Sequence, residues 1–472
     1  MTRATATKTR RPKTTKTSNN SNGIRTFRNA VSYLDTLTNY ERVPRFQYNP
    51  ANFGLARMQR ILKALGNPHK AFKSVHIAGT KGKGSTATML AEMIRANGIK
   101  VGLYTSPHIL DIRERIRINS DMIGETEFAR MIAKVASVAK TAKVSNPTYF
   151  EVLTAAAFQY FSESEIELAV VEVGMGGRLD STNVISPEAI GITSISLDHM
   201  AQLGPNLESI AAEKAGVIKK GVPIICAPQP PSVKEVIRKA AEEAGAPLRF
   251  SDEEADYSYR FEFSRAIGRH ARICLTTPTS RFEHLPVPLP GEHQAINCGL
   301  ALGLLDALKN KGFEIDDQKA VTGLSEVHLP GRMQLIRESP RIIVDGAHNS
   351  ASVDALMRAI GQNITYDSMV VIFGCFKDKD ITGMIRRIQV GADKVIFTST
   401  GHPRSADPAE LAAMYTEASG KMAQVARSLD QAMPIAMGAV GRDDVICITG
   451  SFYLVAEAIR KYAVKGVRLP VA

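Results

Sequence analysis

Tryptophan, long apolar runs and closely spaced cysteine pairs are all missing from this chain of 472 residues. Because no run reaches the roughly 18 apolar residues that a membrane-spanning helix needs, the sequence predicts no transmembrane segment. The five cysteines lie far apart, which favours reduced thiols over a disulfide framework or a zinc site. With 44% hydrophobic residues, we expect a soluble globular protein of the cytoplasm.

Acidic residues are missing before Asp35, whereas eight Lys or Arg lie before residue 30. These cations account for most of the net charge of +12. Residues 1–23 are mainly Thr, Ser, Lys, Arg and Asn, a composition that predicts a disordered basic arm. A transit peptide is the alternative, although the arm lacks the Leu, Ile and Phe of an amphipathic helix. No basic stripe interleaved with aromatic residues follows, so we expect neither nucleic acid nor a membrane as a partner.

The segment GTKGKGS at residues 79–85 follows an apolar run and precedes an amphipathic helical pattern. A strand, a glycine turn and a helix start form a phosphate cradle, since backbone N–H groups and the helix N-terminus face the anion. Lys83 can reach the outer phosphates, and a hydroxyl such as Ser85 can hold Mg²⁺. The loop is two residues shorter than the usual phosphate loop and Ser85 is displaced by one, so tight packing alone is the alternative.

Apolar strand patterns alternate with helical patterns along most of the chain, which predicts parallel, doubly wound sheets. Residues 26–65 are predicted as two helices around a loop that contains Phe53 to Arg57. Short β-like runs between residues 246 and 288 predict a small antiparallel appendage. Pro330-Gly331 marks a linker, and we therefore expect one domain over residues 24–329 and a smaller Rossmann-like domain over residues 333–472.

Polar residues stand where several predicted strands end, at the sheet edge that binds ligands in such folds. They are Ser106, Asp180, His199 and Asp345. Glu172 lies within an apolar strand, where a carboxylate must meet a cation or hydrogen-bond donors. A Mg²⁺ ion held by hydroxyl and carboxylate oxygens is one explanation, and a salt-bridged core glutamate is the other.

The predicted turn at Asp345, His348 and Asn349 has two explanations as well. These residues could recognise a nucleotide or substrate, or they could cap the helix that follows. Lys214 lies on a predicted helix, and its spacing indicates no more than an ordinary solvated lysine. Cys375 lacks a neighbouring base and is not predicted to be a nucleophile.

Nine sequence blocks, taken in order, resemble folylpolyglutamate synthase and dihydrofolate synthase of the Mur-ligase superfamily. The resemblance runs from about residue 27 to the C-terminus, and the short spacing of the phosphate loop is typical of that superfamily. Lys81 departs from the family, which usually has Asn there. The blocks are GTKGKGS, YTSPHI with IRERIRI, TYFEVLTAAAF, EVGMGGRLDSTN, SLDHMAQLG with EKAGVIK, GEHQAINC, PGR, DGAHN and FGCFKDKD.

The resemblance implies an ATP-dependent ligase that adds L-glutamate to dihydropteroate, to (tetrahydro)folate, or to both. It also implies ATP and Mg²⁺ as cofactors, small-molecule partners, a monomeric enzyme, an N-terminal P-loop ATPase domain and a C-terminal domain that binds glutamate. The alternatives are a Mur-type ligase acting on a muropeptide and a nucleotide-binding switch or scaffold without ligase activity.

Residue roles follow from the same resemblance, block by block. It implies catalytic roles for Lys83, Lys214 and His199, with Lys214 matching a lysine that is carbamylated in the family. It implies metal binding by Ser85, Ser106, Glu172 and His199. It implies ATP binding by Thr80, Gly82, Lys83, Gly84, Ser85, Asn297, Arg332 and Asp345. It implies pterin binding by Thr148, Tyr149, Phe150, Glu151, Leu179, Asp180 and Ser181, with Phe53 to Arg57 near the same pocket.

Overall fold

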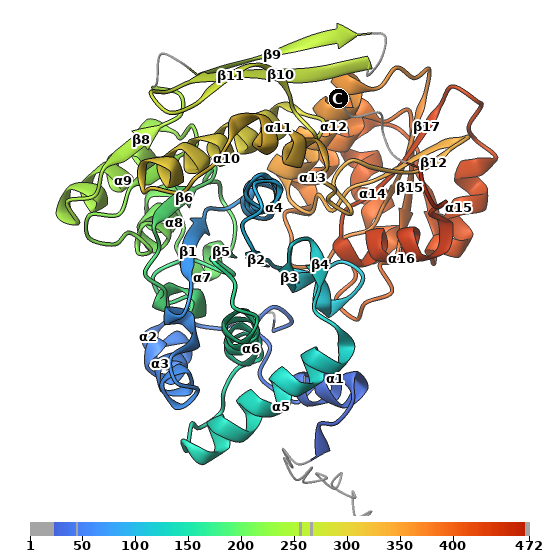
Figure 1. The fold of residues 1–472 in the computed structure, drawn as a ribbon. Helices are drawn as coiled ribbons and strands as arrows, with labels where there is room; N and C mark the ends of the chain where they lie inside the picture. Colours follow the sequence, from blue (N-terminus) through green and yellow to red (C-terminus); the bar gives the residue numbers. More distant parts are fainter. Residues whose placement is uncertain (1–22, 44–45, 254–256, 265–267, 468–472) are drawn as a thin grey trace, which may run out of the picture.

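The computed structural model describes residues 23–43, 46–253, 257–264 and 268–467 (Figure 1). The predicted basic arm therefore lies outside the described residues, except for Gly23. Within the described part, the chain forms an eight-stranded sheet, a six-stranded sheet and a small three-stranded sheet. The prediction of two α/β units with a β appendage is confirmed.

The eight-stranded sheet has the order β4-β3-β2-β5-β1-β6-β7-β8, with β1 near its centre. Neighbours from β2 to β8 pair in parallel, whereas β3 and β4 are antiparallel additions at one edge. The strands are β1 Lys73–Ala78, β2 Val101–Tyr104, β3 Ile116–Ile118, β4 Asp121–Met122, β5 Leu168–Glu172, β6 Ala189–Ile192, β7 Ile224–Cys226 and β8 Leu248–Phe250.

Helices cover both faces of this sheet, because side chains of a buried strand point alternately to opposite faces. In β5, Leu168 and Val170 face the core shared with α4 and α10, and Ala169 and Val171 face the core shared with α5 and α6. The helices are α1 Phe27–Asp35, α2 Pro50–Phe53, α3 Leu55–Ala64, α4 Lys83–Ala96, α5 Glu125–Thr141, α6 Tyr149–Glu163, α7 Met200–Leu203, α8 Leu207–Ala215, α9 Pro231–Glu243, α10 Glu292–Asn310 and α11 Asp317–Ser325.

One sequence-based expectation about these helices is wrong. Phe53 ends α2 and residues 55–57 begin α3, so the segment from Phe53 to Arg57 is helical rather than a loop. Gly54 is the single residue between the two helices, and its extended backbone gives the bend that the prediction had spread over five residues. Asn49 caps α2 through its side chain, and Pro50 occupies the first helical position.

The antiparallel appendage consists of β9 Tyr257–Ser264, β10 Gly268–Thr276 and β11 Arg281–Pro286, in the order β11-β10-β9. It lies over α10 at one end of the molecule (Figure 1). Ala271, Ile273 and Phe282 join the core beneath it. At the free edge, the β9 side chain of Phe263 is 72% exposed.

The C-terminal sheet has the order β12-β13-β17-β14-β15-β16, and all pairs except β12–β13 are parallel. Its strands are β12 Gln334–Glu338, β13 Arg341–Val344, β14 Met369–Phe373, β15 Lys394–Thr398, β16 Gln424–Ala426 and β17 Val445–Thr449. Its helices are α12 Ser350–Asn363, α13 Ile381–Gly391, α14 Pro408–Ser419, α15 Leu429–Met437 and α16 Phe452–Tyr462.

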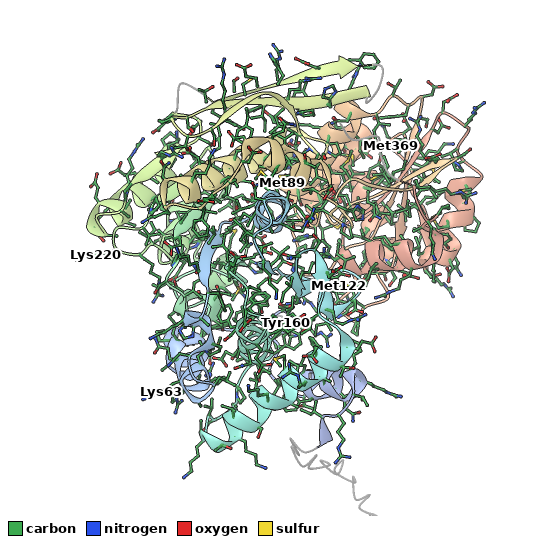
Figure 2. All side chains as sticks on the ribbon, in the orientation of Figure 1. Lys63, Met89, Met122, Tyr160, Lys220 and Met369 are labelled. Carbon is green, nitrogen blue, oxygen red and sulfur yellow. The ribbon has the colours of Figure 1, made fainter. Side chains whose placement is uncertain are left out.

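This second sheet is also covered on both faces, as a doubly wound fold requires. Along β14, Met369 and Val371 join the core with α12 to α14, whereas Val370 and Ile372 join the core with α15 and α16. Figure 2 shows Met369 among these side chains, well apart from Met89 on α4 in the first core. No described helix is long and apolar enough to cross a membrane.

Candidate active site

The carboxyl ends of β1, β2, β5 and β6 meet at one edge of the eight-stranded sheet. β1 lies between β5 and β6, and the chain crosses from one side of β1 to the other after β5. Ligands bind at such a switch point in open parallel sheets. Several of the predicted site residues follow these strand ends directly, and the sheet topology therefore brings them together.

The phosphate loop after β1 depends on two glycines in the left-handed region. Gly79 has a φ of 137° and Gly82 a φ of 89°. A Cβ atom would overlap the hydroxyl of Thr193 at Gly79 and the side-chain oxygen of Asn297 at Gly82. These positions therefore exclude other residues, and α4 begins at Lys83 immediately after the turn.

Thr80 joins this loop to the segment that follows β6. Its hydroxyl donates to the carbonyl of Ser196 at 3.2 Å and accepts from the N–H of Ser196 at 3.2 Å. The N–H groups of Thr80 and Lys81 donate to the carbonyl of Ser194. The loop is thus held by the segment that carries His199.

Glu172 ends β5 with its side chain beside the phosphate loop. It is only 3% exposed, and one carboxylate oxygen accepts the N–H of Ser106 at 2.9 Å. The same oxygen would lie 3.3 Å from a Cβ at Gly84. Burial raises the pKa of Glu172, and the positive charges of Lys83 and Arg332 oppose this rise only in part. This carboxylate faces cations but pairs directly with none that the described structure contains.

Lys214 on α8 is 4% exposed, so the expectation of an ordinary solvated lysine is wrong. Its ammonium donates to the carbonyl of Gly79 at 2.6 Å. Burial, together with the charges of Lys83 and Lys81, lowers the pKa of Lys214 well below its usual range. A lysine that readily becomes a neutral amine can react with carbon dioxide, and this is the chemistry that carbamylation needs.

His199 precedes α7 in the left-handed conformation, with a φ of 52°. Partial desolvation and the positive charges of Lys379 and Lys214 lower its pKa to about 4, although the residue keeps exposed surface and the neighbouring Asp198 acts in the opposite direction. The imidazole is therefore neutral at pH 7, the state in which histidine binds a metal. No hydrogen bond joins the side chains of His199 and Glu172 among the described contacts.

The donor set suits Mg²⁺ in part. Glu172 is a buried carboxylate with spare acceptor capacity, and Ser85 and Ser106 lie at the same sheet edge. Hydroxyl and carboxylate oxygens are what a hard cation prefers. Among the described residues, no three His, Cys, Asp or Glu side chains form a group that could hold a metal. The protein alone thus offers few charged ligands, a pattern typical of Mg²⁺ that also uses phosphate oxygens and water.

The predicted nucleotide residues beyond the loop lie on α10, in the interdomain linker and directly after β13. Asn297 is 4% exposed and lies against Gly82, with its amide donating to Gln294. The guanidinium of Arg332 stacks over the ring of Phe452 at 4.9 Å. Asp345 accepts the N–H groups of Met333 and Ala347 at 2.8 Å each. Burial raises the pKa of Asp345, while the charge of Arg332 opposes this rise.

The predicted pterin residues of the third block form the N-terminus of α6. Thr148 and Glu151 make a reciprocal capping box, in which each side chain accepts from the backbone N–H of the other. The Glu151 carboxylate also pairs with Arg57 at 3.0 Å. Tyr149 and Phe150 follow the cap, and the Phe150 ring lies against Gly174. The predicted proximity of Arg57 to this segment is confirmed.

The other predicted pterin segment begins after β5. Asp180 is 5% exposed and accepts the N–H of Met175 at 3.0 Å and that of Thr182 at 3.0 Å. The N–H of Leu179 donates to the hydroxyl of Tyr48 at 3.2 Å. Ser181 begins a short 3₁₀ helix that Asp180 caps. In both predicted pterin segments, a side-chain cap therefore fixes the backbone at the same sheet edge.

Two polar networks near the site were not predicted from the sequence. The guanidinium of Arg115 is 1% exposed and pairs with both oxygens of Glu41 at 2.7 Å, while its Nε donates to His108 at 2.9 Å. The second network joins Lys81 to Asp198 at 2.7 Å. Arg115 and Glu41 are 74 positions apart, and only the IRERIRI block carried a signal that Arg115 belongs to the site.

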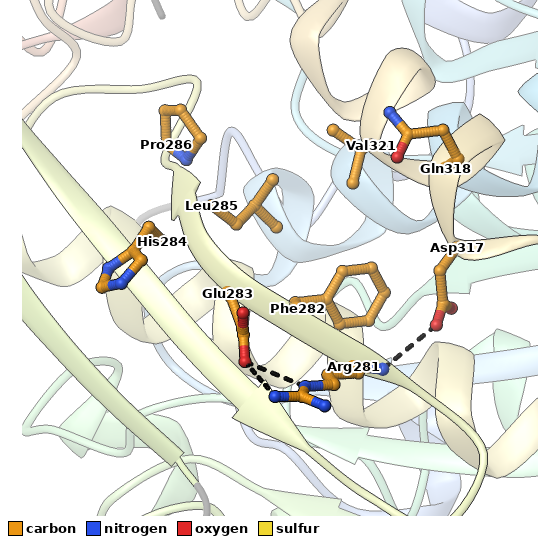
Figure 3. A pocket seen from close by; sticks show the side chains of 9 residues that line it. All are labelled: Arg281, Phe282, Glu283, His284, Leu285, Pro286, Asp317, Gln318 and Val321. Atoms are coloured by element: carbon orange, nitrogen blue, oxygen red, sulfur yellow. Dashed lines mark hydrogen bonds and ion pairs between the residues drawn. The ribbon is translucent and has the colours of Figure 1, made fainter.

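A surface cavity of about 220 Å³ lies between β11 and α11. Figure 3 shows Arg281 paired with Glu283, and the backbone N–H of Arg281 donating to Asp317. The charges of Arg281 and Glu283 thus offset each other, and Asp317 already accepts a hydrogen bond. None of the predicted site residues lines this cavity. Its lining consists of Arg281, Phe282, Glu283, His284, Leu285, Pro286, Asp317, Gln318 and Val321.

Two family models match the chain, one on each side of the linker. The Mur ligase middle domain matches residues 77–305, and the glutamate ligase domain of Mur ligases matches residues 331–452. A phosphate loop at the switch point of one doubly wound unit, followed by a second unit, defines a protein of the Mur-ligase class.

Individual relatives narrow the class. The dihydrofolate synthase/folylpolyglutamate synthase of Bacillus subtilis is 34% identical over 413 residues, which cover 86% of this chain and 94% of that protein. Folylpolyglutamate synthase of Mycobacterium tuberculosis, solved with ADP, has a TM-score of 0.83 at 29% identity, covering 94% of this chain and 99% of the other. Escherichia coli FolC, solved with DHPP and ADP, has a TM-score of 0.78 at 29% identity over 91% and 97%. The chain belongs to the dihydrofolate synthase/folylpolyglutamate synthase family.

Proposed function

We propose that this protein is an ATP-dependent carboxylate–amine ligase that adds L-glutamate to dihydropteroate, to (tetrahydro)folate, or to both. The observation that carries the proposal is the arrangement around residues 79–85, where Lys83 begins a helix, Lys214 contacts Gly79 and Glu172 lies beside Gly84. This arrangement gathers two lysines and a carboxylate around a loop built for phosphates. The family relationship supports the nature of the acid and the amine.

The reaction takes place in two displacements. A carboxylate oxygen of the pterin acid attacks the γ-phosphorus of ATP, the bond to the β-phosphate oxygen breaks, and ADP leaves. The amine of glutamate then attacks the acyl carbon, inorganic phosphate leaves, and the amine loses a proton. Lys83 and the N–H groups of Gly82 and Gly84 favour the first displacement, because they offset the repulsion between two anions.

Two Mg²⁺ ions belong to this proposal: Ser85 would hold one, and Ser106, Glu172 and His199 would hold the other. Bound there, the ions would neutralise charge on the phosphoryl group. Lys214 would join this set after carbamylation, because the modification replaces an ammonium with an anion. Its burial and its lowered pKa support that assignment.

The pterin acid would bind between the capped start of α6 and the segment of Leu179 to Ser181. Thr148, Tyr149, Phe150 and Glu151, at the start of α6, would form one wall of that site, and Asp180, the cap of the next 3₁₀ helix, would form the other. Asn297 on α10, Arg332 in the linker and Asp345 after β13 would contact the nucleotide, and the domain over residues 333–472 would bind glutamate. Closing that domain over the loop would exclude water, which otherwise hydrolyses an acyl phosphate. We further propose a monomer that works in the cytoplasm.

The ligase assay tests this proposal directly. Purified protein with ATP, Mg²⁺ and L-glutamate should release phosphate only when dihydropteroate or tetrahydrofolate is added, with a product heavier by one glutamate by mass spectrometry. Release that depends instead on a muropeptide precursor would establish the Mur-type alternative, which the relatives do not favour. Comparison of the two pterin acids in the same assay defines the substrate preference.

Carbamylation of Lys214 has its own test. Lys214→Ala should lose turnover, and short carboxylates such as acetate or propionate should restore part of it. A control variant, Lys220→Ala, changes an exposed lysine nearby and should behave as the wild type. A fully active Lys214→Ala enzyme without added carboxylate would exclude a role for the modification.

A further inference from the structure

Lys81 is the one loop lysine that the proposed chemistry does not use. Its ammonium pairs with the Asp198 carboxylate at 2.7 Å, and both side chains are mostly buried, at 28% and 13% exposure. The partner belongs to the segment after β6 that Thr80 also holds. Hydrogen bonds and an ion pair therefore join the phosphate loop to the segment 194–198.

Asp198 also faces the other domain. The same carboxylate oxygen that pairs with Lys81 accepts from the side-chain amide of Asn349 at 3.4 Å. Asn349 caps α12, and it does so through its oxygen, which accepts the N–H of Ser352 at 2.9 Å. The amide nitrogen is left free for Asp198. One side chain thus ends a helix of the C-terminal domain and reaches the first domain.

These contacts form a continuous path from the phosphate loop to the start of α12. The path lies close to the linker side of the molecule, where Gly346 N–H donates to the carbonyl of Gly331. Two further contacts between the domains lie elsewhere: Arg460 donates to the carbonyl of Leu110 at 2.8 Å, and Arg404 to that of Glu41 at 3.5 Å. Of the contacts made by Asn349, Arg460 and Arg404, only that of Asn349 reaches the phosphate loop, because its partner Asp198 is paired with Lys81.

We propose that Lys81 is a positioning residue that, through Asp198 and Asn349, couples the phosphate loop to the position of the C-terminal domain. The proposal rests on the proposed ligase function, since the coupled event is the approach of a glutamate site to a phosphoryl group. An anion entering the loop competes with Asp198 for the Lys81 ammonium. Loop occupancy and domain position therefore influence each other, and such coupling is reciprocal.

The test is a double-mutant cycle with Lys81→Met and Asn349→Ser. Serine is also a good N-cap, so Asn349→Ser keeps α12 and removes only the amide that reaches Asp198. Each single change should raise the glutamate KM by about 5-fold or more, the usual range of coupling between sites, and leave kcat less affected. The double variant should be no worse than the poorer single variant, because both changes break one path.

A second readout does not depend on turnover. Hydrogen exchange of amides in residues 345–353 should become faster in Lys81→Met, although these residues belong to the other domain. Lys81→Arg should restore both protection and KM, since a guanidinium reaches the same carboxylate. Lys220→Met is the matched control, at an exposed position far from the C-terminal domain (Figure 2), and should change neither.

Two results would overturn the coupling role. The first is that the effects of Lys81→Met and Asn349→Ser on the glutamate KM add up in the double variant. The second is that Lys81→Met leaves hydrogen exchange in residues 345–353 unchanged. Either result would mean that Lys81 is only a local phosphate contact. Failure of the ligase function has a different signature, because the wild type would then release no phosphate with any pterin acid while the exchange effect could still be measured.

Discussion

Glu172 combines deep burial with a single hydrogen bond, from the N–H of Ser106. Glu172→Gln keeps the shape and an oxygen acceptor but removes the charge that offsets cations around the loop. We expect turnover to fall by about 100-fold or more, the scale of losing a preorganised charge in an active site. The melting temperature should not fall, because a neutral group no longer opposes its own burial.

Steady-state phosphate release and thermal denaturation measure the two effects. Glu235→Gln on the exposed face of α9 is the matched control and should leave both unchanged. A Glu172→Gln enzyme with wild-type turnover would show that this carboxylate is a structural core residue, which was the other explanation of its sequence position.

His76 lies in the middle of β1 with no exposed surface, and its Nε2 is 2.8 Å from the hydroxyl of Thr182. Burial, together with the charge of Lys219, lowers its pKa from 6.5 to about 3. The unfolded chain therefore binds this proton first as the pH falls. The contribution to stability is complete above pH 6.5 and is lost progressively between 6.5 and 3.

We predict that His76 alone lowers the free energy of unfolding by about 1.4 kcal/mol when the pH falls from about 7.5 to about 5.5. The linkage relation gives this value because the unfolded state takes up one proton over that range. His76→Gln keeps a donor toward Thr182 and does not titrate. In urea unfolding at both pH values, the free energy of unfolding of the variant should fall less than that of the wild type, by that amount. Parallel pH profiles of the two proteins would contradict the neutral, buried histidine.

The residues of the phosphate loop and of the strand ends could be predicted because each motif is local in sequence. Lys83, Glu172 and Asp180 were found from a glycine turn or from a polar residue at the end of an apolar strand. Lys81 and Asp198, by contrast, are 117 positions apart, and their pairing depends on how two strands lie side by side. Burial of Lys214 is likewise a property of packing, and no periodicity marks it.

At the level of elements, the turn into α4 offers a comparison between two glycines. Gly82 and Gly98 flank this helix with φ values of 89° and 86°. A Cβ at Gly82 would overlap Asn297, whereas nothing lies within 4 Å of a Cβ at Gly98. Alanine at either position costs backbone strain of about 1 kcal/mol, and only Gly82→Ala also displaces a side chain of the nucleotide site.

We therefore predict that Gly82→Ala weakens ADP binding by about 10-fold or more, the equivalent of roughly 1.4 kcal/mol, while Gly98→Ala binds ADP as the wild type does. Calorimetric titration measures the affinity, and denaturation shows whether both variants are folded. Equal ADP affinities in the two variants would mean that strain, rather than the clash with Asn297, dominates at Gly82.

Helices with clear caps were predicted well, as α12 shows: it begins at Ser350, and Asn349 caps it. The failure at Phe53 to Arg57 has a physical reason. Helices α2 and α3 are short, and α2 contains only four residues, too few for an apolar period to be visible. Asn349 caps α12, which is one of the two explanations that the sequence offered, and it also contacts Asp198 of the first domain, which neither explanation predicted.

At the level of the whole molecule, the absence of tryptophan is an experimental advantage. Tyr160→Trp on α6 and Tyr366→Trp before β14 each introduce a single fluorescent reporter at a half-buried position, one per domain. Without ligand, the two reporters should unfold in one transition, because Gly331 packs against Ile109 and Val455 at the junction.

ADP at 100 times its dissociation constant should stabilise both reporters by about 2.7 kcal/mol. The proposed nucleotide contacts come from the first domain, the linker and Asp345 after β13, so the ligand has to be released before either domain unfolds. Separate transitions, with only the Tyr160→Trp signal shifted by ADP, would show that the nucleotide binds the first domain alone.

The free edge of β9 has a consequence for how the protein behaves in concentrated solution. Phe263 is 72% exposed and Phe261 39% exposed on a strand whose outer backbone groups have no strand partner in the described sheet. Such an edge can pair with another chain unless charges keep the two apart. Arg260 and Glu262 alternate with the phenylalanines, but they pair with each other and so leave no net charge to repel a second copy. Concentrated samples should therefore associate through this edge, and a charged residue in place of Phe263 should keep them dispersed.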